Sequence, residues 1–367
     1  MYNIPKGDQQ TMYKSFSYAQ IFDLCKEIFK SYGYDEEDSK QIADVVISAD
    51  LSGVESHGIS RMIKYHQFIQ NGAISTKAKP ELVFETPISA VYDAHKGIGQ
   101  LVSARAMQEA ITKAKKTGIG LVQVRNSNHY GIAGYYSAMA AKEDLMGICM
   151  TNSVSIMVPT FGSEAMLGSN PIALAMPADP TPFLFDASTT VVTRGKIEVY
   201  HKQEKPLPDG WAVDEKGKTL SAPDKLLKNI SNSLGGGILP LGGYGEENSG
   251  YKGYGFGMIC EILSSVLSGG VPSNHKTDDG DTSHCFYAVD YGIFGEKEKI
   301  RSEFSAFLNE VRGAKKASGC NRIYIPGEKE LESQKLYKEK GIQMNQKTFS
   351  ELKMISEMQG ISSELFE

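Results

Sequence analysis

The sequence is poor in cysteine and has no cysteine pair at metal-binding spacing. Its five cysteines are an odd number and none of them forms CxxC: they are Cys25, Cys149, Cys260, Cys285 and Cys320. This argues against a tetra-cysteine zinc site and against a secreted disulfide framework. The N-terminus lacks the apolar segment of a signal peptide, and no uncharged apolar run reaches the roughly 18–20 residues of a membrane-spanning helix. We therefore expect a cytoplasmic protein with no membrane partner.

An excess of positive charge and the common nucleotide and metal motifs are also missing. The chain carries 39 Lys and Arg residues against 44 Asp and Glu residues, a net charge of −5. A strongly basic nucleic-acid surface is therefore not expected, and we predict no nucleic-acid partner. Neither GxGxxG nor GxxxxGK[ST] occurs, which excludes the standard dinucleotide and P-loop fingerprints. HExxH is absent as well, and we predict no metal site.

Glycine, in contrast, is abundant. The chain has 37 glycines in 367 residues, more than the usual share of about 7%. Most of them lie beside hydrophobic runs, which is typical of an enzyme with many tight turns between strands and helices. The length alone predicts roughly two domains.

The periodicity of apolar residues divides the chain into regions. Helical spacing behind the capping residue Ser17 predicts a helix near the N-terminus, and a second helix runs down to the SGVESHGISRM segment. Strands and helices alternate over residues 88–200, which predicts an α/β architecture. The C-terminal quarter returns to helical patterns around one expected strand at residues 321–327.

Polar clusters stand at the ends of three expected strands. They are NSNHYG at residues 126–131, TNS at residues 151–153 and FDAST at residues 185–189. In open α/β sheets, ligands usually sit outside the carboxyl ends of the strands. We therefore expect these clusters to surround a binding site.

The cluster at residues 56–61 carries the first candidate groups. His57 lies at a helix exit, where a histidine titrates near neutrality and suits general acid or base catalysis. Arg61 offers a planar fork that matches a carboxylate. The alternative is a structural helix end, in which His57 caps the last carbonyls and Arg61 is a solvated charge.

Two further titratable groups follow strands. His129 is an acid or base, or a group that orients a cofactor; the alternative is a hydrogen-bonded histidine in a turn. Asp186 is placed to hold an imidazole in one tautomer, and the alternative is a helix N-cap. In the glycine-dense loop at residues 241–255, backbone can approach a phosphate or a ring, and Lys252 adds positive charge. The alternative there is a flexible loop over a buried helix.

Taken together, these segments resemble one known family. SHGISRM, NSNHYGIAGYYSAMA, MTNS, GSNPIALAMP, FDAST, KPLPDGWAVD and LGGYGEENSGYKGYGFGMICEILSSVLSGG look like the type-2 malate/L-lactate dehydrogenase family. That family also contains sulfolactate and ureidoglycolate dehydrogenases. The match spans about residues 17–330 in the family's order and looks most like the malate/lactate branch. It would explain the missing GxGxxG.

The resemblance implies a fold and a division of the chain. The expected fold is α/β, with a non-Rossmann nucleotide-binding mixed sheet like that of sulfolactate dehydrogenase and a helical domain formed by both chain ends. Residues 86–270 would form the cofactor-binding α/β domain. Residues 1–85 plus 271–367 would form a mainly helical, discontinuous domain. A homodimer is also implied.

The resemblance also implies roles for particular residues. His57 would be proton donor and acceptor with Asp186 as its partner, while Ser56 and Arg61 would bind the substrate. His129 would lie beside the nicotinamide, and in some members the equivalent histidine is assigned the catalytic role, so the choice between His57 and His129 stays open. The remaining cofactor-binding positions would be Ser153, Ala187, Ser188, Thr189, Lys252, Gly327 and Glu328.

The expected activity is interconversion of a small 2-hydroxy acid and its 2-oxo acid, with L-malate and oxaloacetate as the first choice. NAD is the expected cofactor, and NADP is possible. L-Lactate, sulfolactate and ureidoglycolate are alternative substrates within the family. From other classes, the alternatives are a metal-dependent hydrolase or lyase that uses His57, His129 and Asp186 as ligands, and a non-catalytic binding protein.

Overall fold

The centre of the protein is a seven-stranded mixed sheet. The computed structural model describes residues 13–276, 280–362 and 364–366. The strand order is β2-β3-β4-β10-β5-β6-β7. Only β3 and β4 pair in parallel; the other neighbours pair antiparallel. The strands are β2 (Glu81–Glu85), β3 (Ser89–Asp93), β4 (Ile119–Ser127), β5 (Met146–Thr151), β6 (Ile172–Met176), β7 (Phe183–Ala187) and β10 (Thr282–Val289). The predicted α/β mixed sheet is confirmed.

Helices cover both faces of this sheet. On one face, α4 (Gly99–Thr117) and α5 (Ala133–Lys142) pack on Val122 of β4 and Phe286 of β10 through a core rich in alanine. The preceding residue of β10, Cys285, points to the opposite face because side chains alternate along a strand. There it meets Cys260 of α8 (Gly250–Glu261). The π-helical turn Ile262–Val266 continues α8 across β4, β10 and β5.

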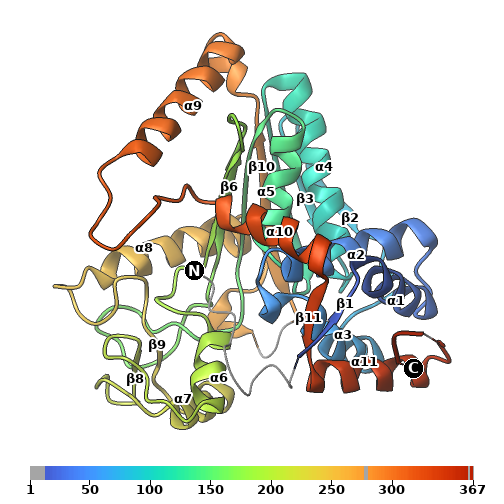
Figure 1. Ribbon diagram of the computed structural model, residues 1–367, viewed down its shortest axis with the longest axis vertical. Helices are drawn as coiled ribbons and strands as arrows, with labels where there is room; N and C mark the ends of the chain where they lie inside the picture. Colours follow the sequence, from blue (N-terminus) through green and yellow to red (C-terminus); the bar gives the residue numbers. More distant parts are fainter. Residues whose placement is uncertain (1–12, 277–279, 363, 367) are drawn as a thin grey trace.

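Both chain ends join in one helical region. Helices α1 (Tyr18–Ser31), α2 (Glu36–Leu51) and α3 (Met62–Gln70) share a hydrophobic core with α11 (Gln346–Met358), and Figure 1 shows them side by side. Strand β1 (Tyr13–Phe16) pairs antiparallel with β11 (Ile342–Asn345), and α10 (Glu328–Lys340) packs on α2. Ser17 caps α1 in a reciprocal capping box with Gln20, as the sequence predicts.

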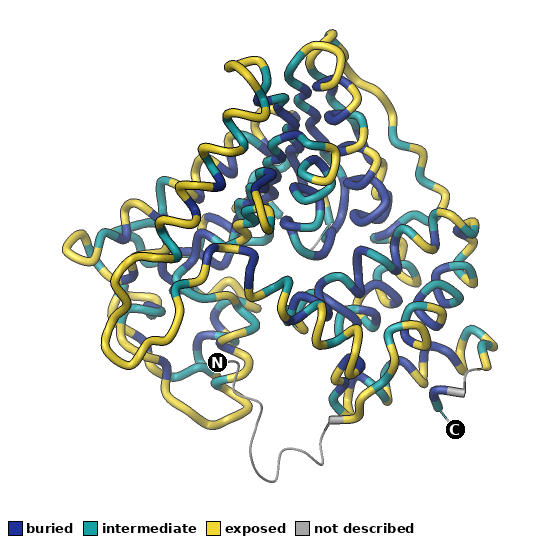
Figure 2. Tube along the Cα trace, turned by 45° about the horizontal axis from the view of Figure 1, so that its top comes forward, coloured by how far each residue is buried: buried dark blue, intermediate teal, exposed yellow. Residues whose placement is uncertain are grey.

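A smaller unit and one long helix complete the fold. Helices α6 (Arg194–Lys202) and α7 (Pro223–Ser231), with the short strands β8 (Ala212–Val213) and β9 (Gly237–Ile238), enclose a separate small core. Helix α9 (Lys297–Gly313) runs along the outside. Figure 2 shows the buried residues concentrated in the sheet, α4 and the paired N-terminal helices, and exposed residues along α9.

Two expectations for the C-terminal quarter differ from the structure. Residues 321–327 form no strand; the strands of this region are β11, which pairs with β1, and β10, which lies at the middle of the seven-stranded sheet. The segment expected to join the helical domain, residues 271–367, therefore contributes the central strand of the sheet. A strand buried on both faces lacks the polar–apolar alternation that marks a half-buried strand, and Thr282, Ser283 and His284 at its start hide the apolar run.

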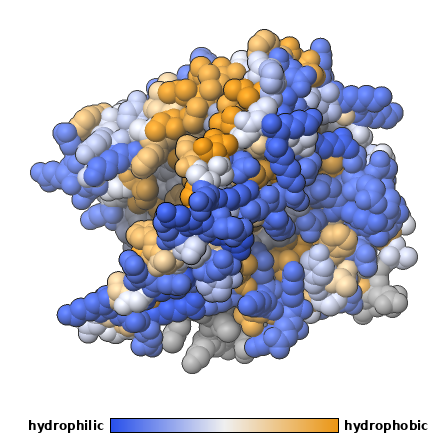
Figure 3. Space-filling model, turned by 90° about the horizontal axis from the view of Figure 1, so that it is seen from above, coloured by the Kyte–Doolittle hydropathy of each residue, from blue (hydrophilic) through white to orange (hydrophobic). Residues whose placement is uncertain are grey.

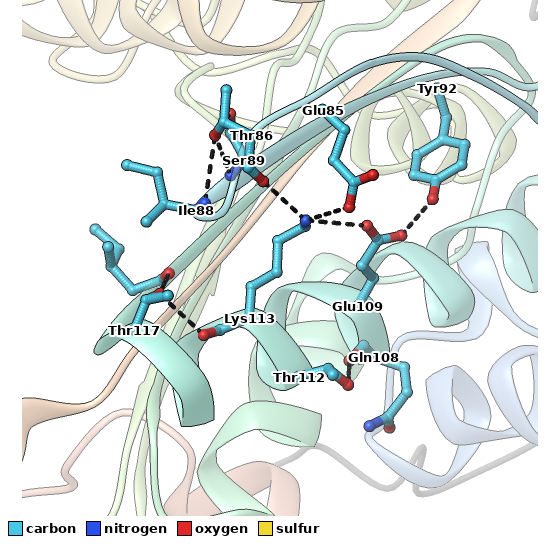
Figure 4. A network of polar contacts seen from close by, with 11 residues as sticks. Glu85, Thr86, Ile88, Ser89, Tyr92, Gln108, Glu109, Thr112, Lys113 and Thr117 are labelled. Carbon is cyan, nitrogen blue, oxygen red and sulfur yellow. Dashed lines mark hydrogen bonds and ion pairs between the residues drawn. The ribbon is translucent and has the colours of Figure 1, made fainter.

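The β2–β3 hairpin is held to α4 by a buried cation. Lys113 of α4 donates to Glu85 Oε1 at 2.8 Å and to the carbonyl oxygen of Thr86 at 3.1 Å. Glu109, one turn earlier, accepts from Tyr92 Oη of β3 at 2.5 Å. Figure 4 shows these side chains meeting between the hairpin and the helix. Because the side chains of β2 are otherwise exposed, this polar network supplies the contact that apolar packing does not.

Candidate functional site

The three polar clusters lie at the carboxyl ends of three strands, on one side of the sheet that we call its carboxyl edge. Strands β4 and β5 both pair antiparallel with β10, and β7 is antiparallel to β6, which is antiparallel to β5. Strands β4, β5 and β7 therefore run in the same direction, and their carboxyl ends share an edge. Residues 126–131, 151–153 and 185–189 thus lie together, as the sequence analysis expects.

His57 reaches this edge from the helical region. After α2 the chain makes two short 3₁₀ turns, Glu55–His57 and Ile59–Arg61. Gly58 joins them because a Cβ there would lie 2.1 Å from Oδ2 of Asp50, which also accepts from the backbone N–H of Ile59 at 2.7 Å. Only glycine allows this close approach, so the turn that presents His57 is fixed by its packing on α2.

His57 and His129 form a pair. Their ring centroids are 5.3 Å apart. Nδ1 of His57 hydrogen bonds to Oγ of Ser56 at 2.8 Å, and Nε of Arg61 donates to the Ser56 carbonyl at 2.6 Å. No ion pair in the described part of the chain involves Arg61. Its guanidinium therefore keeps donors available for an incoming carboxylate.

Tyr65, which the sequence analysis does not select, holds His129. Its hydroxyl lies 2.8 Å from Nδ1 of His129, and the backbone N–H of Gly131 donates to the same nitrogen at 3.4 Å. Because an N–H donates to it, Nδ1 is an acceptor, and the proton of the neutral ring sits on Nε2. Tyr65 follows Arg61 by four residues on one helical face, and this spacing is the signal that could have identified it.

The electrostatics of the pair favour neutral rings. Burial, followed by the charge of Arg61, lowers the pKa of His57 to about 4. Burial, Arg61, His57 and Lys64 together hold the pKa of His129 well below its ordinary value. Both side chains are only half-buried at their surfaces, so water reaches them although protein surrounds most of each ring. A pair of neutral bases beside two cations suits proton transfer near an anionic ligand.

Asp186 lies apart from both histidines in its contacts. Its Oδ2 accepts from the backbone N–H of Gly134 in α5 at 2.7 Å. Within the described residues, no hydrogen bond or ion pair joins it to His57 or His129. Enclosure by protein raises the pKa of Asp186 to about 6, although solvent reaches the side chain. The expected His57–Asp186 partnership is therefore not formed in this conformation.

Several expected cofactor-binding residues are joined by hydrogen bonds. Oγ of Ser153 accepts from the backbone N–H of Ser169 at 3.0 Å. The hydroxyl of Thr189 donates to the carbonyl oxygens of Ser169 and Asn170, each at 3.1 Å. Ala187 ends β7 opposite Ile172, and Ser188 donates to the Thr190 carbonyl at 3.3 Å. These contacts connect the ends of β5, β6 and β7 into one continuous edge.

The last three expected positions are more dispersed. Gly327, the N-cap of α10, has φ +97°, and a Cβ there would lie 2.8 Å from Cβ of Leu184, so it packs closely on β7. Glu328 is buried and forms ion pairs with Arg312 at 2.7 Å and Arg322 at 2.9 Å. Its carboxylate is thus already occupied by internal partners. Lys252 is exposed on α8 beside the ring of Tyr251.

Comparison with known proteins agrees with this architecture. The family model described as malate/L-lactate dehydrogenase matches residues 16–353. A malate dehydrogenase of Pyrococcus abyssi is 40% identical over 97% of this chain and 98% of its own. An L-sulfolactate dehydrogenase of Methanocaldococcus jannaschii is 37% identical over 93% of this chain and 96% of its own. The crystal structure of malate dehydrogenase from Entamoeba histolytica superimposes with a TM-score of 0.92 at 35% identity, covering 96% of this chain and 99% of its own.

These matches extend over nearly the whole chain and include both the helical region with His57 and the sheet edge with His129. They confirm the expected class of enzyme, a dehydrogenase acting on hydroxy acids. By its sequence and by its fold, the chain belongs to the malate/L-lactate dehydrogenase family.

Proposed function

We propose that this chain interconverts L-malate and oxaloacetate with NAD(H) as coenzyme. The observation that carries the proposal is the grouping of two neutral histidines, His57 and His129, with the cationic Arg61 at the carboxyl edge of the sheet. Relatives named malate dehydrogenase at 40% identity support the choice of substrate.

The sheet edge fits a nicotinamide coenzyme. Half-buried hydroxyls of Ser153 and Ser188 stand at the strand ends, where sugar and carboxamide groups need hydrogen-bond partners. Lys252 is exposed and, in the described residues, forms no ion pair with a carboxylate, which suits a pyrophosphate. When bound, the coenzyme supplies or accepts the hydride.

The chain's own groups perform the proton transfer. In the oxidation direction, the substrate hydroxyl loses a proton to His57 as its C–H hydrogen leaves with its electron pair as hydride. His57 is neutral at pH 7 in the free protein, because its pKa is lowered to about 4, and its unprotonated nitrogen is therefore open to that proton. An anionic substrate that binds Arg61 offsets the cation that helps to lower this pKa, which makes His57 a stronger base in the complex. His129, with its proton on Nε2, donates a hydrogen bond and orients the reacting group. Arg61 binds the substrate's C1 carboxylate through its guanidinium fork.

A substrate with two anionic groups is supported by the relatives and by the positive charge near His129. Besides burial, Arg61 and Lys64 both contribute to the lowered pKa of His129. Relatives at 40% and 37% identity are named malate dehydrogenase and L-sulfolactate dehydrogenase, and malate and sulfolactate each carry two anionic groups. These observations support malate or sulfolactate over lactate and ureidoglycolate.

The metal-dependent alternative requires His57, His129 and Asp186 to meet around one ion. In the described residues, no three histidine, cysteine, aspartate or glutamate side chains gather in a way that suits a metal ligand set. Asp186 instead accepts from Gly134 in α5. The arrangement of the side chains thus favours the dehydrogenase.

A homodimer is supported by helix α8 and its π-helical continuation. Large apolar residues occupy the buried side of this segment and its exposed side, where Phe256, Ile259, Ile262, Val266 and Leu267 are 43–58% exposed. A helix that is apolar all round is expected to be covered all round, and a second copy of the chain is the simplest cover. Figure 3 shows that apolar side chains gather in the upper part of the face that it views, with smaller separate apolar areas elsewhere on that face.

A cytoplasmic location is supported by the thiols. All five cysteines are free, and Cys320 is exposed, which suits a reducing compartment.

The function is tested by following absorbance at 340 nm with NADH or NADPH and a panel of 2-oxo acids. We expect oxaloacetate to give the highest kcat/KM. His57→Ala should lower kcat at least 100-fold. Arg61→Ala should mainly raise KM for the oxo acid, and Arg61→Lys should recover only part of that loss because lysine lacks the fork. Near-wild-type turnover in both His57→Ala and Arg61→Ala would refute the assignment.

A further inference from the structure

Glu261 is a buried carboxylate that no step of the proposed reaction uses. It is the last residue of α8, directly before the π-helical turn, and is 6% exposed. Its oxygens accept five hydrogen bonds of 2.7–3.1 Å, all from neutral groups. The donors are the side-chain amides of Asn152 and Asn170, the hydroxyls of Ser265 and Ser273, and the backbone N–H of Ser273.

Through the two asparagines, Glu261 is connected to the carboxyl edge of the sheet, where the coenzyme is proposed to bind. Asn170 Oδ1 accepts from the backbone N–H of Ser153 at 3.2 Å, and the Asn170 carbonyl accepts from the hydroxyl of Thr189 at 3.1 Å. Asn152 directly precedes Ser153, and its Oδ1 accepts from the backbone N–H of Ser283 at the start of β10 at 2.9 Å. Four chain segments that meet at the edge are thus fixed, directly or through one asparagine, by one carboxylate.

Burying this carboxylate has a desolvation cost, and proteins most often carry such costs at functional sites. A buried carboxylate loses its hydration, and neutral donors compensate for that loss less well than a cation does. Two further costs lie in the same place. Asn170 has φ +37°, in the left-handed region that non-glycine residues avoid, and residues 262–266 form a π-helical turn, a feature found most often at functional sites.

We propose that Glu261 is a positioning residue for coenzyme binding: it holds Asn152 and Asn170 so that Ser153 and Thr189 keep the geometry that the coenzyme needs. This inference rests on the proposed function, since it concerns the same site. Glu261 acts through its hydrogen-bonded neighbours and does not itself touch the reacting atoms.

The test is the dissociation constant of NADH, measured by fluorescence titration in the absence of oxo acid. Glu261→Gln keeps the shape of the side chain but turns one acceptor into a donor that faces other donors. We expect its Kd to rise at least tenfold. KM for oxaloacetate at saturating NADH should stay within twofold, because His57 and Arg61 belong to another part of the chain. Glu261→Asp, which keeps the charge, should recover part of the affinity.

A matched control separates positioning from general stability. Glu109→Gln makes the same change in the network between α4 and the β2–β3 hairpin (Figure 4). It should lower the melting temperature and leave the Kd of NADH unchanged. If Glu261→Gln does not fold, Asn170→Gly replaces it, because glycine accepts φ +37°. This variant removes the link between Glu261 and Ser153, together with one hydrogen bond to the Gly257 carbonyl; the same tenfold loss is expected.

The outcomes distinguish this inference from the function on which it rests. If the wild type binds NADH and a folded Glu261→Gln or Asn170→Gly binds it within twofold as tightly, the positioning role is wrong and the dehydrogenase assignment stands. If the wild type binds neither NADH nor NADPH, both are wrong. An equal loss of affinity in Glu109→Gln would also overturn the positioning role.

Discussion

The two histidines of the site come from parts of the chain that are far apart in sequence, and each is oriented by a different neighbour. Ser56 contacts Nδ1 of His57, and Tyr65 contacts Nδ1 of His129. A hydrogen bond to one ring nitrogen determines which nitrogen faces the reaction. In the proposed reaction, the division of roles between the two histidines is therefore attributed to Ser56 and Tyr65, which hold the rings.

The variant Tyr65→Phe tests whether the hydroxyl of Tyr65 orients the ring of His129. The variant removes the hydroxyl contact to His129, leaves the ring in the core and costs about 1 kcal/mol of stability, typical of one lost hydrogen bond. We expect kcat/KM for oxaloacetate to fall about tenfold, and the ¹⁵N chemical shifts of His129 to show a mixture of tautomers. Unchanged shifts and unchanged kcat/KM would show that Tyr65 is not needed to orient the ring.

Asp186 should leave a signature in the pH dependence of stability. Enclosure raises its pKa in the folded protein to about 6, above that of an unfolded aspartate. The folded state therefore binds this proton more tightly, and stability is lost as pH rises from about 4 through 6. The asparagine in the variant Asp186→Asn does not titrate. The unfolding free energy of the variant, relative to that of the wild type, should therefore increase as the pH rises through this range. The gain should be at most about 1 kcal/mol, because solvent reaches the side chain. Chemical denaturation at pH 4.5 and pH 7.5 measures it, and a gain at the lower pH would contradict the assignment.

At the scale of elements, close packing of α4 on the sheet sets the position of the strand that ends at the site. A Cβ at Gly120 of β4 would lie 1.9 Å from the carbonyl oxygen of Ala110 in α4. Both groups are backbone or attached to it, so neither can rotate away. The distance between α4 and β4 therefore requires glycine, which has no side chain, at position 120.

Gly120→Ala should accordingly destabilise the protein by about 3 kcal/mol, because overpacking must move a helix or a strand. Gly313→Ala in α9 is the matched control: a Cβ there meets nothing within 4 Å, and its stability should equal or slightly exceed that of the wild type. Thermal melting compares the two variants. A Gly120→Ala protein that melts at the wild-type temperature would show that α4 adjusts without cost.

At the scale of the whole molecule, the exposed side of α8 and of the π-helical turn is apolar, and no other part of the described chain covers it. Ile259, Ile262 and Val266 follow one another at three- and four-residue spacing and are 43%, 44% and 58% exposed, respectively. Their opposite side packs on the sheet whose carboxyl edge carries the proposed coenzyme site. The proposed dimer contact and the proposed coenzyme site therefore involve the same helix.

Ile259→Lys combined with Val266→Lys should convert the proposed dimer into a monomer. Each copy would bring two unpaired ammonium groups into the interface, where burial removes their hydration. Val199→Lys is the control, since Val199 is equally exposed (43%) but lies on α6. Size-exclusion chromatography with light scattering gives the mass. A double variant with the wild-type mass, or a monomeric wild type, would place this surface outside any dimer interface.

The sequence by itself determined the family, the α/β class and the candidate residues at the strand ends, because motifs and periodicity are local properties of the chain. His57, Arg61 and His129 were identified in this way, and so was the capping residue Ser17. The tertiary structure decided which of these groups meet. It joined His57 to His129, brought in Tyr65, placed β10 at the centre of the sheet and directed the carboxylate of Asp186 to Gly134. These are contacts between residues far apart in sequence. Their distances depend on how elements pack, and no local pattern encodes them.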